Sequence, residues 1–205
     1  MRRLRSLLGV GGIVMVLVTT AACGGNERDA TASALDSGFE IVEHDAEHAE
    51  VVGHGISMLV PASWEASGEE KVGQRGDTYE WAVQAEAGGD SFPPFVNMSM
   101  AVPDKESTSL EAAIGSLKAI QGVDPDFSVD EEGEVEVPGA EKAYQLRFER
   151  TDTYQGQEVS VEMVQLFLVM PDDLLSTVRF QAPAGEFDES GLQAVRDSLV
   201  VDVDE

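Results

Sequence analysis

The sequence predicts an α+β protein, in which an antiparallel β-sheet is flanked by α-helices. In most segments the apolar side chains recur at every second residue, the period of a strand that turns one face to the core. Only two segments, residues 108–122 and 188–201, show the longer period of an amphipathic helix. Because the strands come in runs and do not alternate with helices, antiparallel pairing is expected, with the helices on the faces of the sheet.

Three strands are predicted before the first helix. Ile56, Met58 and Val60 occupy alternate positions, and Pro61 ends that strand because proline cannot donate to a sheet ladder. This alternation is typical of strands that are buried on one face only. The other two segments are DTYEWAVQAEA (77–87) and FVNMSMAVP (95–103).

The first helix has recognisable ends. Thr108 followed by Glu111 matches a capping box, and Gly122 is a typical helix stop. Its apolar residues at helical spacing are Leu110, Ala113, Ile114, Leu117 and Ile120.

Four strands and a second helix are predicted after an acidic turn. The segment that begins at Met163 is apolar on both faces, which indicates a central strand covered from both sides. Polar residues around Gly156 predict a hairpin before it. The four strands are GEVEVPG (133–139), AYQLRFER (143–150), EVSVEMVQLFLVM (158–170) and LLSTVRFQAP (174–183). In the second of them Tyr144, Leu146 and Phe148 are expected to point inward. The helix is expected to bury Leu192, Val195 and Leu199.

Residues 1–22 have the three-part form of an export signal. A basic start with Arg2, Arg3 and Arg5 is followed by an apolar stretch and then by small residues before Cys23. The apolar stretch of about a dozen residues is shorter than the roughly 20 that a membrane-spanning helix needs. A signal that is removed is therefore favoured over a retained transmembrane anchor.

Cys23 is the only cysteine of the chain, and it follows directly after small residues. This arrangement resembles the lipobox of bacterial lipoproteins, in which the thiol is acylated and cleavage makes the cysteine the new N-terminus. Thr20 stands where the lipobox prefers Leu or Val. The alternatives are general secretory cleavage after Ala22 and a buried free cysteine. We expect lipidation of Cys23 by at least two acyl chains, such as palmitate, which would anchor the protein stably on the outer face of the cell membrane.

The remaining chain divides into a linker and one domain. Residues 23–50 are small and charged, which predicts an acidic flexible tether of about 25 residues that spans roughly 25–30 Å. Phe39, Ile41 and Val42 could instead dock or form a short first element. Residues 51–205 have the length of a single domain.

The charge of the chain excludes two classes of partner. The formal net charge is −26, and loss of residues 1–22 leaves ten basic residues against 39 acidic ones, a net charge of −29. Nucleic acid and anionic lipid headgroups both require a basic surface. A single cysteine also excludes a disulfide framework, so the core must be held by apolar burial.

The strand that ends in Val60 and Pro61 is followed by Trp64, and the order of elements continues with a central helix, a long hairpin and a C-terminal helix. In these features the chain resembles the PsbP-like superfamily, including the actinobacterial lipoproteins of the LpqN type, over residues 51–201. The resemblance implies an antiparallel sheet flanked by helices that serves as a binding or accessory module. It implies no catalytic residues, because the superfamily shares none, and it implies that Trp64 packs at a strand end.

All three histidines lie close together in the sequence, as His44, His48 and His54. On a helix His44 and His48 would share one face, and this pair with His54 or a carboxylate could bind zinc or copper. The alternative is that the histidines of an acidic linker titrate in solvent.

A second candidate metal site lies just after the first helix. Asp124, Asp126, Ser128 and Asp130 have the alternate spacing of a calcium-binding EF-hand loop. Val129 and Val135 occupy the positions of the required Gly and bidentate Glu, however. The alternative is a solvated acidic turn.

No sequence pattern of a nucleophilic or nucleotide-binding enzyme is present. We therefore expect a non-enzymatic binding or accessory lipoprotein without a cofactor, whose partner is an envelope protein or an apolar ligand. The alternative function is a surface receptor that binds a metal or a small ligand through His44, His48 and His54.

Overall fold

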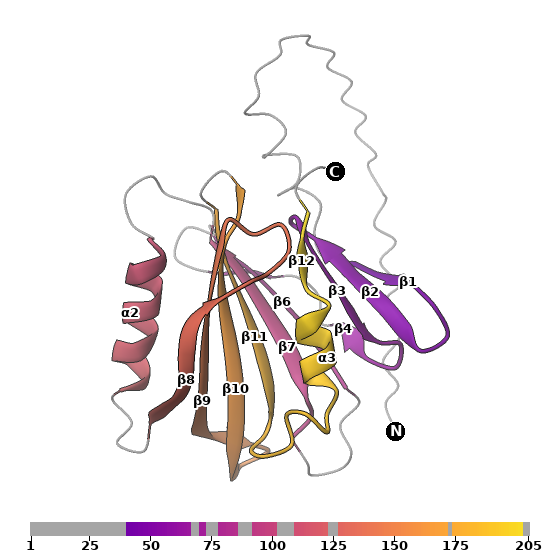
Figure 1. The fold of residues 1–205 in the computed structure, drawn as a ribbon. Helices are drawn as coiled ribbons and strands as arrows, with labels where there is room; N and C mark the ends of the chain where they lie inside the picture. Colours follow the sequence, from indigo (N-terminus) through magenta and orange to yellow (C-terminus); the bar gives the residue numbers. More distant parts are fainter. Residues whose placement is uncertain are drawn as a thin grey trace, which may run out of the picture.

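The computed structural model describes residues 40–66, 70–72, 78–85, 92–101, 109–122, 127–171 and 174–202. Within these residues the strands form two antiparallel sheets, and two helices lie against the larger one (Figure 1). The predicted α+β class is confirmed. No helix in these ranges has the length and apolar character needed to cross a membrane.

The smaller sheet has four strands in the order β1-β2-β3-β12. Strand β1 and the first half of β2 lie in the segment predicted to be a tether, so residue 40 already belongs to the folded domain, which was predicted to begin at residue 51. The alternating burial of β2 explains this difference, because Ala49 and Val51 are core residues and Ile41 of β1 packs beside them. The strands are β1 (Glu40–Glu43), β2 (His48–Gly53), β3 (Ile56–Pro61) and β12 (Val200–Val201).

The larger sheet has the order β4-β6-β7-β11-β10-β9-β8, and β5 also pairs with β6. Strand β10 lies in the interior of the sheet with the long strands β9 and β11 on either side, as the two-sided apolar pattern predicted. The strands are β4 (Glu65–Ala66), β5 (Glu70–Val72), β6 (Thr78–Gln84), β7 (Phe95–Ala101), β8 (Ser128–Val135), β9 (Lys142–Tyr154), β10 (Gln157–Val169) and β11 (Leu175–Pro183).

The predicted helices are α2 (Leu110–Gln121) and α3 (Leu192–Asp197). Helix α2 ends at Gly122 as expected, but its N-cap is Ser109, one residue after the predicted Thr108. The Ser109 hydroxyl accepts a hydrogen bond from the Ala112 amide at 3.2 Å, which satisfies an amide at the helix start. This hydroxyl and the backbone amide of Glu111 lower the pKa of the Glu111 carboxyl, the backbone amide contributing most.

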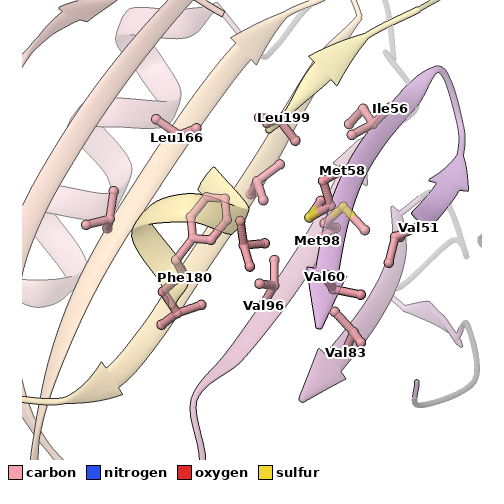
Figure 2. Close-up of a cluster of buried hydrophobic side chains, with 14 of the residues drawn as sticks. Val51, Ile56, Met58, Val60, Val83, Val96, Met98, Leu166, Phe180 and Leu199 are labelled. Carbon is pink, nitrogen blue, oxygen red and sulfur yellow. The ribbon is translucent and has the colours of Figure 1, made fainter. Parts of the chain in front are cut away.

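One face of the larger sheet is covered by the smaller sheet and α3 (Figure 1). Figure 2 shows Met58 of the smaller sheet beside Met98 of the larger sheet, and Val60 near Val96 and Val83. Phe180 belongs to the same buried cluster.

The three predicted inward residues of the second helix are all buried, but α3 ends at Asp197, so Leu199 lies beyond it, and the predicted last residues of the helix form β12. Trp64 is buried in the same cluster, as the resemblance implied.

The opposite face is covered over β8, β9 and β10 by α2. The buried cluster there contains Leu146, Phe148, Met163 and Phe167, and four of the five predicted apolar residues of α2 pack against it. The fifth, Ile120, is 68% exposed, because the contact with the sheet is made by the preceding turns of the helix.

Candidate functional site

A cavity of about 510 Å³ lies where the chain leaves β8 and returns as β9. Its walls are mostly apolar, from Val135 to Ala143, while Glu136, Glu141 and Lys142 supply charges. An apolar concave surface with a few polar groups is the usual form of a binding site. The lining residues are Val135, Glu136, Val137, Pro138, Ala140, Glu141, Lys142 and Ala143.

Backbone hydrogen bonds hold this loop in place. The Pro138 carbonyl accepts from the Val201 amide of β12 at 2.8 Å, and the Glu141 amide donates to the Val169 carbonyl of β10 at 2.8 Å. The side chains of Val137 and Ala140 pack against the main core. The cavity is therefore attached to both sheets by backbone hydrogen bonds.

Strand β8, which leads into the cavity, forms one outer edge of the larger sheet. Its acidic side chains are exposed, and a β-bulge interrupts its pairing with β9 between Val129 and Glu131. These acidic residues are Asp130, Glu131, Glu132 and Glu134. Short, charged and bulged edges are common in proteins because they discourage pairing between copies.

One of these carboxylates also contacts α2. Lys118 forms an ion pair with Glu132, and this hydrogen-bonded partner raises the pKa of the Lys118 ammonium. The contact joins α2 to the edge strand, while Glu131 and Glu134 of the same strand are also exposed.

A second charged group lies under the loop between β11 and α3. Arg147 Nε donates to Glu162 Oε1 at 2.7 Å, and the amide of Gly185 donates to Glu162 Oε2 at 3.3 Å. The guanidinium carbon of Arg147 also lies 5.4 Å from the centre of the Phe187 ring. Since the Glu162 side chain is only 7% exposed, this arrangement serves to fasten the loop to the sheet.

The structure does not bring the three histidines together. His44 and His48 lie at the β1–β2 turn, whereas His54 lies in the turn after β2. The length of β2 separates His48 from His54 by about 20 Å along the strand. Among the described residues there is no group of three potential ligands that could hold a metal ion.

The predicted helical pairing of His44 with His48 is also absent, because this segment is a turn. Asp45 Oδ1 accepts hydrogen bonds from the amides of Glu47 and His48, both at 2.8 Å, and His48 Nδ1 lies 3.2 Å from the same oxygen. His54, by contrast, is only 2% exposed. Of the acidic neighbours of the histidines, Asp45 therefore serves to form the turn.

Asp45 predicts a measurable acid dependence. The two backbone amides lower the pKa of its carboxyl below the ordinary 3.8. The ionised carboxylate therefore stabilises the folded protein above about pH 3.8, and this contribution is lost as the pH falls through the lowered pKa. We expect the Asp45→Asn variant to be less stable than the parent at pH 7. At a pH low enough to protonate Asp45 in the parent, the two proteins should have the same melting temperature. Thermal melts from pH 7 to pH 2 would show this, with the exposed Glu43→Gln as the control for net charge. A constant difference at all pH values would contradict the assignment.

Two other predicted sites can be placed in part. Asp124 and Asp126 lie outside the described residues, but Ser128 and Asp130 are residues of strand β8 and not of a loop. Cys23 also lies outside the described residues. The cavity itself was not predicted, although Pro138-Gly139 after a short strand was a signal for a turn at this position.

The comparisons with known proteins concern the fold alone. No protein-family model matches the sequence, and no curated protein matches it. Among solved structures, the chain is similar to LpqN of Mycobacterium tuberculosis, described as involved in cell envelope biogenesis, with a TM-score of 0.48 and 13% identity over 88% of this chain and 99% of LpqN.

Two further structures have a similar degree of likeness. The yeast (Saccharomyces cerevisiae) Ran-binding protein Mog1p has a TM-score of 0.43 and 10% identity, over 81% of this chain and 96% of Mog1p. PA94 of Pseudomonas aeruginosa, a protein of unknown function, has a TM-score of 0.45 and 10% identity, over 80% and 96%. LpqN, whose type the sequence was expected to resemble, is thus among the solved structures to which this chain is similar.

Proposed function

We propose that the chain is a bacterial cell-envelope lipoprotein whose α+β domain is a non-enzymatic binding or accessory module on the outer face of the membrane. The observation that carries the proposal is the N-terminal sequence, in which a basic start, an apolar stretch and small residues lead directly to the only cysteine, Cys23. Residues 24–39 then separate this cysteine from strand β1.

The domain supports a binding role in two ways. Its cavity at residues 135–143 has apolar walls that are held by hydrogen bonds to β10 and β12. Its buried carboxylate, Glu162, is occupied by Arg147 and by the Gly185 amide in holding a loop. The alternative of a metal receptor is not favoured, since the three histidines occupy two separate turns.

Lipidation is tested by labelling cells that express the full chain with a clickable palmitate analogue. We expect the parent to be labelled and to sediment with membranes, and Cys23→Ser to lose the label and appear in the soluble fraction. Thr20→Leu is the matched control, because it brings the signal closer to the lipobox pattern and should retain labelling. Persistent labelling of Cys23→Ser would rule out the proposed anchor.

A further inference from the structure

We propose that the outer edge of β8, from Glu131 to Val135, and the cavity at residues 135–143 form one docking surface for an extended basic segment of a partner protein. The inference rests on the proposed binding function and specifies its partner. The segment would add a strand beside β8 and insert an apolar side chain into the cavity.

The first argument is the position of β8. It pairs with β9 on one side, and no strand of the described residues pairs with its other side. An edge strand has backbone N–H and C=O groups directed away from the sheet, and an extended peptide can pair with them. The bulge after Val129 interrupts the ladder, so the regular part of this edge is the five residues from Glu131 to Val135.

The second argument is the continuity between this edge and the cavity. Val135 is both the last residue of β8 and the first residue that lines the cavity. A strand paired along the edge would therefore end beside apolar walls that include Val137 and Ala140. An apolar residue at that end of the partner would be removed from water.

The third argument is charge complementarity. Strands place alternate residues on opposite faces, so Glu132 and Glu134 share one face of the sheet, while Glu131 lies on the other. Glu131 and Glu134 are exposed, Glu132 is exposed but also pairs with Lys118, and Glu136 follows at the rim of the cavity. Lysines opposite these positions would form cross-strand pairs of opposite charge, which are favourable.

Gly133 supplies room for the partner. A Cβ atom added there would meet no atom within 4 Å, so the space above this residue is open. A side chain of the added strand that lies opposite Gly133 can occupy that space without displacing any group of the domain.

The negative charges of these glutamates also disfavour the two other partners that could occupy this edge, a second copy of the chain and an anionic lipid surface. Two copies of the chain would place like charges opposite each other, which is destabilising across a strand pair. An anionic lipid surface is disfavoured for the same reason. A basic extended peptide is the partner that satisfies the backbone groups, the carboxylates and the cavity together.

The test uses the purified full chain in detergent and a synthetic peptide of about seven residues, with lysines at the positions opposite the glutamates and leucine at the cavity end. Binding is followed by fluorescence anisotropy of a labelled peptide. We expect saturable binding that weakens with added salt, because exposed charge pairs are screened. Replacing the peptide leucine with serine should weaken binding about fivefold, since an apolar side chain is then no longer buried.

Backbone pairing is separated from simple charge attraction by two N-methylated peptides, one methylated at odd and one at even positions. In a β-ladder only alternate amides face the neighbouring strand, so one peptide should lose binding and the other should keep it. Equal binding by both, or equal loss in both, would overturn the added-strand arrangement.

Protein variants locate the site. Glu134→Lys should weaken binding about tenfold, because it places a like charge beside the peptide. Glu189→Lys makes the same charge change at an exposed residue of the loop between β11 and α3, and it should leave binding unchanged. Equal weakening by both variants would overturn the site. Cys23→Ser should bind the peptide like the parent, so failure of lipidation and failure of peptide docking give separate results.

Discussion

Replacing Gly139 with alanine is expected to lower the free energy of unfolding by about 3 kcal/mol. Gly139 has a φ of +81°, and a Cβ atom there would lie 1.7 Å from the Val201 carbonyl oxygen. Because the clash is with backbone, either the loop or β12 must move, and the hydrogen bond from the Val201 amide to the Pro138 carbonyl would be lost. Urea unfolding would give the change in stability.

Gly156→Ala is the matched control for this prediction. Gly156 has nearly the same backbone conformation, with a φ of +82°, but an added Cβ would meet nothing within 4 Å. Only the strain of the left-handed conformation remains, which costs about 1–2 kcal/mol. If both variants lose the same stability, the close approach of Gly139 to Val201 is not the cause.

The second large effect is expected for Arg147→Met, which should lower the free energy of unfolding by about 3 kcal/mol. The substitution leaves the Glu162 carboxylate, only 7% exposed, without its cationic partner. Its remaining hydrogen bond from the Gly185 amide, at 3.3 Å, does not replace the charge. Urea unfolding at neutral pH would measure the loss.

Removing both charges should reverse most of this effect. In the double variant Arg147→Met with Glu162→Leu no charge remains buried, and apolar replacements of buried pairs are often nearly neutral. Arg150→Met breaks the more exposed pair with Asp152 on the same strand and should cost about 1 kcal/mol. A double variant as unstable as Arg147→Met would show that the loss comes from the packing of Arg147 on Phe187.

Much of the fold could be predicted because the information is local. The two-residue period of Ile56, Met58 and Val60 identified β3, and the two-sided apolar stretch from Met163 identified the interior strand β10. Such patterns depend only on which side chains face the core. They also predicted the α+β class and the helix that ends at Gly122.

The mispredicted regions are those where local composition conflicts with long-range contacts. The segment from 40 to 50 reads as an acidic linker, yet it forms strands because β2 pairs with β3 and buries Ala49. The acidic residues before Gly133 read as a turn, yet they belong to β8 because β9 provides a long strand with which to pair. Ladder hydrogen bonds can compensate for low strand propensity.

The candidate site was also beyond prediction from the sequence. The histidines are neighbours in the chain, but the intervening strand β2 moves His54 away from His48. The cavity depends on backbone hydrogen bonds that join Pro138 to Val201 and Glu141 to Val169. Val201 and Val169 are both distant in sequence from the loop that they hold.

Composition and spacing alone reveal the lone Cys23 after an export-type signal, the strong negative charge and the alternation of most strands. Composition does not reveal that the strands form two sheets, that acidic β8 lies at an edge of the larger sheet or that a cavity follows it. The physical reason is that strand order and edges are set by pairing between distant segments, and such pairing leaves no periodic signal in either partner alone.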